Sequence, residues 1–192
     1  MLEFLKNFDT HLLLFINGHN SPFLDSIMYR ISEYKLFWIP LYVLILGYII
    51  YKFRKQSWVI LLGVVVLVIL SDQLSVHLFK NVFHRLRPSH EASLASLLHF
   101  VRNYKGGEYG FISSHAANTF ALATFLALII RNRTFSWFII IWATIVSFSR
   151  VYLGVHYPGD VICGGLFGVL LGFSIDWCTQ KVLLKINEKY SQ

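Results

Sequence analysis

Residues 58–79, WVILLGVVVLVILSDQLSVHLF, decide the fold of this chain. A helix needs about 20 mostly apolar residues to cross the hydrocarbon core of a bilayer, and in this stretch only Asp72 and His77 are ionisable. The whole chain agrees, since 56% of its residues are hydrophobic and 14% are charged, whereas about 25% are charged in a typical soluble domain. The composition excludes a disordered chain, argues against a water-soluble globule and predicts one membrane domain over residues 1–192.

Four further segments are apolar enough to be spans: 36–51, 112–130, 134–149 and 158–178. We therefore predict an all-α, integral membrane helical bundle with a transmembrane core at residues 36–178 and a cytoplasmic tail at 179–192. Residues 1–35 are more polar. They predict an interfacial amphipathic helix over Met1 to Asn17, a break, and a short second helix that Ser21 caps before Pro22. A sixth crossing or a re-entrant hairpin is the alternative for this segment.

The net charge of +7 has two separate sources. Lys and Arg at 52–55, 131–133 and 181–189 lie at one end of the predicted bundle, which the positive-inside rule makes cytoplasmic. They flank apolar spans, which favours membrane topology over nucleic-acid binding. The opposite end carries six further cations that the rule does not explain: Lys80, Arg85, Arg87, Arg102, Lys105 and Arg150.

Polar side chains from distant segments meet at this second end. They are Lys80 and Arg87 after the second span, Ser113, Ser114 and His115 at the start of the third, and Arg150, His156 and Asp160 between the fourth and fifth. Cations can neutralise a phosphoryl group, the arginine fork suits two of its oxygens, and free N–H groups at a helix start bind anions. The pattern predicts a pocket for a phosphate ester.

Two histidines in that pocket permit covalent catalysis, in which one attacks phosphorus and the other protonates the leaving oxygen. Asp160 follows His156 by four residues, and Pro158 between them suits the first turn of the fifth span. A carboxylate at this position can fix the imidazole tautomer and stabilise the cation that forms.

These residues resemble the three motifs of the type 2 phosphatidic acid phosphatases. Lys80 with Arg87-Pro88 is similar to the first motif, and Ser149-Arg150 with His156 and Asp160 to the third. Ile112-Ser113-Ser114-His115 resembles the second, usually Pro-Ser-Gly-His, and departs from it at Ile112 and Ser114.

The resemblance implies a metal-independent phosphatase without a cofactor that works through a phosphohistidine. His156 would be the nucleophile, Asp160 its partner and His115 the general acid. The phosphate would be bound by Lys80, Arg87, Ser113 and Arg150, together with the Ser114 amide. Small bacterial members suggest four substrates: undecaprenyl diphosphate, phosphatidylglycerol phosphate, phosphatidate or a lipid A phosphate.

The expected protein is a lipid phosphatase of the bacterial cytoplasmic membrane whose site faces the periplasm or the outside. A lipid phosphotransferase, or a non-catalytic lipid-phosphate binder or transporter, is the alternative. Neither nucleic acid nor a metal ion is an expected partner, and the sequence does not fix the oligomeric state. Cys163 and Cys178 lie in an apolar run, which argues against a disulfide scaffold or a zinc cluster.

Other features carry weaker hypotheses. The spacing of His84, His90 and His99 matches no metal-ligand pattern, so these are expected as loop residues. Asp72, about 12 Å below Lys80 along a helix, is expected to make a structural hydrogen bond, with a proton path or lipid selectivity as alternatives. Residues 89–110 are expected to form a loop that covers the site and selects the head group, with a short amphipathic helix in it. A glycine stripe at residues 164–172 predicts close helix packing, with dimerisation as the alternative.

Overall fold

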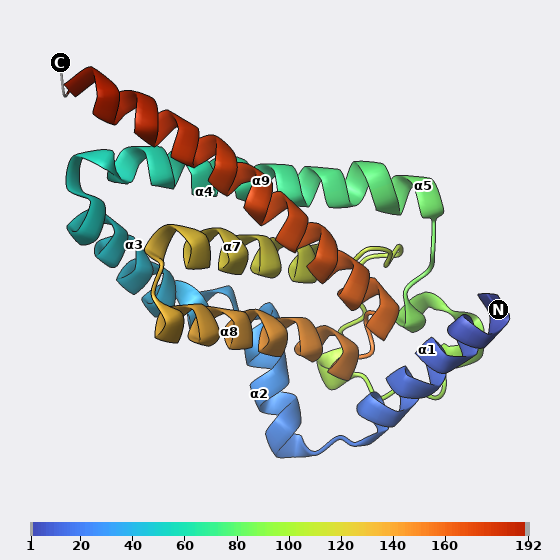
Figure 1. The fold of residues 1–192 in the computed structure, drawn as a ribbon. Helices are drawn as coiled ribbons and strands as arrows, with labels where there is room; N and C mark the ends of the chain where they lie inside the picture. Colours follow the sequence, from blue (N-terminus) through green and yellow to red (C-terminus); the bar gives the residue numbers. More distant parts are fainter. Residues whose placement is uncertain (1, 191–192) are drawn as a thin grey trace.

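A computed structural model describes residues 2–190, and the described chain is a bundle of helices (Figure 1). Five apolar helices correspond to the five predicted spans: α3 (Ile39–Phe53), α4 (Ser57–Leu74), α7 (Ser114–Ile130), α8 (Arg133–Tyr152) and α9 (Pro158–Tyr190). The prediction of an all-α bundle is confirmed.

Three helical stretches within residues 2–190 have the length and hydropathy of membrane spans: Leu36–Phe83, Arg133–Tyr152 and Pro158–Lys189. The first holds both α3 and α4, and the chain turns between them at Arg54, whose φ is positive (45°). The helix α7 is apolar but shorter, with 17 residues.

Side-chain caps fix where the site-bearing helices begin. Ser113 Oγ accepts a hydrogen bond from the Ala116 amide at the start of α7, and Asn132 Oδ1 accepts one from the Phe135 amide at the start of α8. The last helix starts at Pro158, whose missing N–H costs nothing in the first turn. The polar ends of α7 and α9 therefore begin at the motif residues themselves.

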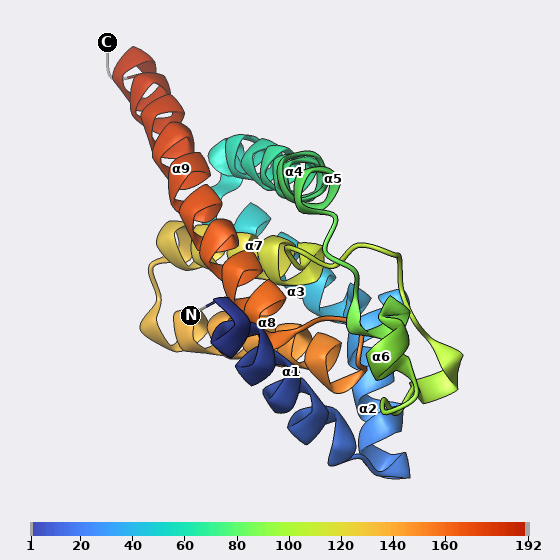
Figure 2. The same ribbon diagram turned by 90° about the vertical axis from the view of Figure 1, so that its right-hand side faces the viewer.

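The helix α7 occupies the centre of the bundle, with α9 crossing directly over it (Figures 1 and 2). A methyl group at Gly164 would lie 2.6 Å from the Ser113 carbonyl oxygen, and one at Gly172 would lie 2.8 Å from the Ala121 carbonyl oxygen. The glycine stripe thus faces α7, and the close packing predicted for it is confirmed.

The N-terminal segment forms α1 (Leu2–Gly18) and α2 (Pro22–Glu33), with Ser21 Oγ accepting from the Leu24 amide as predicted. Met1 of the predicted first helix lies outside the described residues. Phe4, Phe8 and Phe15 are exposed on α1, which is consistent with a helix at the membrane interface. Within residues 2–190, neither α1 nor α2 has the length and hydropathy of a span.

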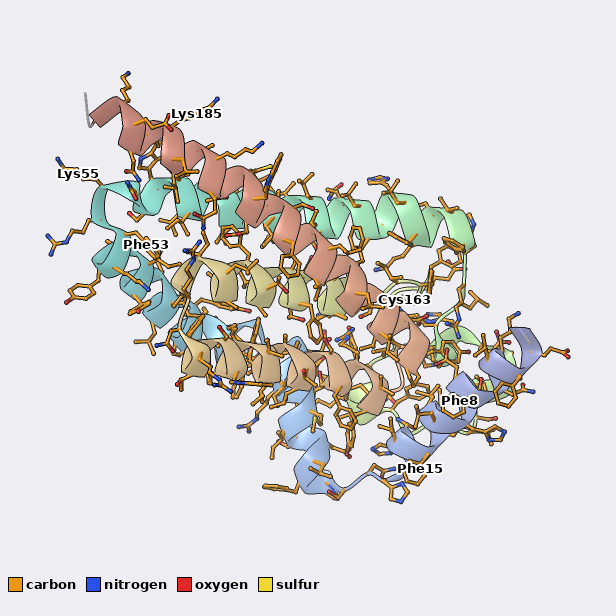
Figure 3. All side chains as sticks on the ribbon, in the orientation of Figure 1. Phe8, Phe15, Phe53, Lys55, Cys163 and Lys185 are labelled. Atoms are coloured by element: carbon orange, nitrogen blue, oxygen red, sulfur yellow. The ribbon has the colours of Figure 1, made fainter. Side chains whose placement is uncertain are left out.

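The two ends of the bundle differ in chemistry. Lys55 and Lys185 lie at the end where α3 turns into α4, whereas Phe8 and Phe15 lie at the opposite end (Figure 3). Residues 179–190, predicted as a tail, continue α9 as one helix; residues 191–192 lie outside the described part.

The loop of residues 89–110 is folded onto the bundle. The predicted amphipathic helix in it is reduced to α6 (Ala92–Ala95), followed by a short 3₁₀ turn, Val101–Asn103. Leu98 is buried in a cluster with Leu13, Val151 and Tyr157. The loop is therefore part of the packed end of the molecule that contains the site.

Candidate active site

Hydrogen bonds join the three motif segments at one end of the bundle. Lys80 Nζ donates to Ser114 Oγ over 2.7 Å, which links the first motif to the second. The Ser113 amide donates to the Asp160 carbonyl oxygen over 3.0 Å, which links the second to the third. Segments up to 80 residues apart in sequence thus meet in one place, as the sequence analysis expected.

His156 and Asp160 lie beneath this meeting point, with 1% and 0% of their surfaces exposed. His156 Nδ1 lies 3.4 Å from Asp160 Oδ2, and the same oxygen accepts a hydrogen bond of 3.1 Å from the Tyr157 amide. Because Nδ1 faces the carboxylate, Nε2 is the ring nitrogen left for chemistry. A methyl group at Gly110 would lie 2.9 Å from Asp160 Oδ2, so the chain approaches this carboxylate as closely as glycine allows.

The electrostatic environment keeps the His156 imidazole neutral. Burial, and then the charges of Arg87, Arg150 and Lys80, lower the pKa of His156 well below its ordinary value. A neutral imidazole retains the lone pair that a nucleophile needs. The same effect shows that all three predicted phosphate-binding cations lie within electrostatic reach of the ring.

A cavity of about 600 Å³ opens beside these groups. Lys80, Arg87, Ser114 and His115 line it, together with Asp72. Four predicted site residues therefore line one cavity, whereas the other four are buried and are not among its lining residues: Ser113, Arg150, His156 and Asp160. The Ser113 hydroxyl serves as the cap of α7.

The two arginines differ in how they are held. Arg150 is 1% exposed, donates to Ser32, Glu33 and the Tyr104 hydroxyl, and keeps Nε without a partner among the described residues. Arg87 Nε donates to the Tyr109 carbonyl oxygen over 3.2 Å, and its buried Nη1 has no described partner. Burial, and then the charge of Arg150, lower the pKa of Arg87. Glu33 pairs with Arg150, whereas Arg87 makes no ion pair with a described residue, and such an unmatched positive charge suits a phosphate pocket.

Ser114, the departure from the usual glycine, has a contact that glycine could not make. Its hydroxyl lies 2.7 Å from Lys80 Nζ and 2.7 Å from Ser75 Oγ, so a chain of two hydroxyls supports the lysine. Ser75 begins a π-helical turn, Ser75–Lys80, which continues α4. Such turns alter the register of the helix and occur often at functional sites.

Sequence reasoning missed a chain of ion pairs behind His156. Arg85 Nη1 donates to Asp160 Oδ1 over 2.8 Å, and its Nη2 donates to Asp9 Oδ2 over 2.7 Å. Asp9 also accepts from the Gly159 amide over 2.7 Å. Burial alone would lower the pKa of Arg85, but Asp160 and Asp9 outweigh it and hold that pKa above its ordinary value. The helix α1 is thereby tied to the carboxylate that faces His156.

The other weak hypotheses resolve as follows. The loop histidines take separate partners: His99 Nε2 lies 2.9 Å from Asp25, His90 bonds Ser89, and the His84 ring packs edge-on against Tyr109. No group of three His, Cys, Asp or Glu side chains in residues 2–190 could hold a metal ion. Asp72 lines the cavity, and its carboxylate makes no hydrogen bond to a described residue, in contrast to the structural bond expected for it.

Known proteins are similar to this chain in sequence and in fold. The family model of the PAP2 superfamily matches residues 56–183. The chain is 39% identical to a lipid A 4'-phosphatase of Bacteroides thetaiotaomicron over 97% of its own length and 84% of that protein. It is 31% identical to an undecaprenyl-diphosphatase of Sulfolobus acidocaldarius, covering 86% of this chain and 76% of that protein.

A solved structure also matches. It is the crystal structure of a PAP2-type phosphatidylglycerolphosphate phosphatase from Bacillus subtilis, with a TM-score of 0.67 and 23% identity over 93% of this chain and 87% of that one. With three motif segments hydrogen-bonded into one site, a matching family model over two thirds of the chain and a shared helical fold, this chain is a member of the PAP2 superfamily of membrane phosphatases.

Proposed function

We propose that this phosphatase hydrolyses a membrane lipid phosphate or diphosphate through a phosphohistidine on His156, at a site on the outer face of the membrane. The observation that carries the proposal is that hydrogen bonds from Lys80 to Ser114 and from Ser113 to Asp160 bring the three motif segments together at the buried pair of His156 and Asp160. The names of the relatives, a lipid A 4'-phosphatase and an undecaprenyl-diphosphatase, support a lipid-bound phosphate as the substrate.

In the first step, His156 Nε2 attacks phosphorus and the bond to the lipid oxygen breaks. His115 gives a proton to that oxygen, so the lipid leaves as an alcohol, or as a monophosphate when the substrate is a diphosphate. Asp160 accepts the Nδ1 proton of His156 in a hydrogen bond and stabilises the cationic phosphoimidazole. In the second step His115 removes a proton from water, which attacks phosphorus and frees His156 and inorganic phosphate.

The five phosphate-binding residues stabilise the charge on the equatorial oxygens during both steps. They are Lys80, Arg87, Ser113, Ser114 and Arg150. Because side chains supply this positive charge, EDTA should not inhibit, whereas vanadate, which mimics the phosphoryl transition state, should.

The charges at the opposite end of the bundle support the orientation. Lys55 and Lys185 lie at the end away from the site (Figure 3). Under the positive-inside rule this supports a cytoplasmic location for that end and a site that faces the periplasm or the outside. A C-terminal fluorescent-protein fusion that folds only in the cytoplasm should therefore fluoresce. Contacts from α1 and α2 to the site support a single domain over the described chain.

The decisive experiment separates the roles of the two histidines. His156→Ala should abolish phosphate release from every substrate. His115→Gln should lose about 10²–10⁴-fold on a lipid phosphate but much less in the first step on p-nitrophenyl phosphate, whose leaving group needs no proton. A burst of nitrophenol followed by a labelled, acid-labile phosphoenzyme is expected for that variant. An active His156→Ala enzyme would overturn the mechanism.

The same experiment decides between the alternatives. Transfer to another lipid would appear as an acceptor-dependent fall in free phosphate, and a binder or transporter would take up lipid phosphate without turnover.

A further inference from the structure

The wall of the cavity below Lys80 carries polar groups that the proposed reaction does not use. Asp72 lies on α4, two helical turns before Lys80, and Asn118 lies on α7, one turn after Ser114. The Asp72 carboxylate makes no hydrogen bond to a described residue, and Asn118 Oδ1 is buried without one. Unpaired polar groups inside a membrane bundle are costly, so these two need a partner that the bound substrate can supply.

Aromatic rings also line the same cavity. Trp142 packs edge-to-face with Trp38, with ring centroids 5.7 Å apart, and with Tyr42, with centroids 6.3 Å apart. All three line the cavity, and the buried Trp142 Nε1 donor has no described partner. Flat apolar rings in one cavity with a carboxylate and an amide suit a sugar ring, which offers C–H faces to the rings and hydroxyl groups to the polar side chains.

An apolar groove of about 500 Å³ adjoins the cavity and shares Tyr42, Asn118, Thr119 and Trp142 with it. Beyond them its lining is aliphatic side chains of α3, α4 and α7. The path from the site thus runs from cations, through a polar and aromatic zone, to an aliphatic zone. This order matches a phosphate on a sugar that carries acyl chains.

We propose that Asp72, Asn118 and Trp142 form a subsite for the sugar ring that bears the scissile phosphate, so that the preferred substrate is an acylated phosphosugar lipid. The inference rests on the proposed phosphatase function and names its substrate class. A phosphate joined directly to a polyprenyl chain would place hydrocarbon against Asp72 and Asn118. Sites built to hydrogen-bond a hydroxyl discriminate strongly against substrates that lack it.

The test compares two acylated lipids whose phosphates are monoesters, one with phosphate on a sugar ring and one with phosphate on glycerol. Purified enzyme is assayed for kcat/KM on a lipid A-type disaccharide bisphosphate and on phosphatidate. The wild type should favour the sugar lipid by at least about 100-fold. Asp72→Leu and Asn118→Leu should each lower this ratio at least about tenfold. Gln73→Leu, next to Asp72 but on the exposed side of α4 and outside the cavity lining, is the matched control and should keep the ratio.

Equal wild-type rates on the two lipids, or folded variants that keep the wild-type ratio, would overturn the sugar subsite while leaving the phosphatase intact. If no lipid were hydrolysed, or His156→Ala were fully active, the proposed function would fail instead. Should the leucine variants not fold, inhibition of the wild type decides. Glucosamine 6-phosphate should inhibit at least about tenfold more tightly than glycerol 3-phosphate, and equal inhibition would refute the subsite.

Discussion

Replacing Arg85 with methionine tests whether the chain of ion pairs behind His156, the proposed nucleophile, sets the activity. Methionine keeps most of the apolar volume of the arginine stem but removes its charge and both of its carboxylate contacts. Asp160, which is fully buried, would then keep only the Tyr157 amide and the more distant His156 ring as hydrogen-bond partners.

The magnitude follows from the burial of the pair. Removing one partner of a buried ion pair costs about 3–5 kcal/mol. Arg85 is 30% exposed, and because solvent screens part of the interaction we expect about 2–3 kcal/mol to be lost. If this loss falls on the transition state, at about 1.4 kcal/mol per tenfold, kcat drops about 30- to 150-fold.

The assay is phosphate release under saturating lipid, with thermal unfolding in detergent as the folding control. Asp9→Asn is the matched variant. It leaves the contact between Arg85 and Asp160 in place, so its loss in kcat should stay below about tenfold. The double variant should be little slower than Arg85→Met alone, because Asp9 acts on the site through Arg85. A folded Arg85→Met enzyme within threefold of the wild-type kcat would refute the reasoning.

Three further outcomes are expected. Ser114→Gly removes the hydroxyl that contacts Lys80 and should lower kcat/KM about tenfold. Ser75→Ala should lower kcat/KM by a smaller factor. An equal loss in the two variants would show that Lys80 does not depend on its direct contact with Ser114. Arg87→Gln removes one of the charges that lower the pKa of His156. That pKa should therefore rise, and the acid limb of the pH profile of kcat/KM should move to higher pH. Measuring this profile on the same substrate checks the prediction, and an acid limb that does not move would contradict it. Gly172→Ala introduces a methyl group 2.8 Å from a carbonyl oxygen and should cost about 1–3 kcal/mol in thermal unfolding. Gly47→Ala on α3 meets no atom of another segment within 4 Å and should be neutral or slightly stabilising, because alanine favours a helix. Equal melting temperatures of the two variants would show that α9 can shift away from α7.

The depressed pKa of His156 also predicts how folding stability depends on pH. The unfolded chain takes up a proton on this histidine near the ordinary pKa of 6.5, whereas the folded protein does not until lower pH. Proton uptake therefore favours the unfolded state, and stability falls as pH drops below about 6.5. Thermal unfolding should show a smaller pH dependence in His156→Gln; the same slope in both proteins would contradict the assignment.

Features with a local sequence signal were predicted well. Apolar runs bounded by charges located the five apolar helices, because hydropathy over about 20 residues reflects the bilayer. Ser21 and Pro22 marked the start of α2 because a cap and a first-turn proline act within a few residues. The glycine stripe at 164–172 predicted the α7 contact for a similar reason.

Features that depend on pairing between distant residues were missed. Asp9 and Glu33 stand among ordinary polar residues in the sequence, yet they contact Arg85 and Arg150 in the folded site. Nothing local distinguishes an acidic residue that will meet a buried arginine from one that faces water. The π-helical turn before Lys80 also lacks a local signal, because one extra residue in a turn does not alter the hydropathy. Such contacts follow from helix packing, which the sequence pattern alone does not give.

The hydrogen bond from the Gly159 amide to the Asp9 carboxylate has a consequence for biogenesis. During translation Asp9 emerges well before Arg85 and Gly159, the two residues that donate hydrogen bonds to its carboxylate. The contacts around His156 can therefore be completed only after α9 has been inserted and α1 has docked against it. A partly inserted chain would have apolar helices in the lipid but an incomplete active site. Catalysis would therefore begin only once all the helices have packed together.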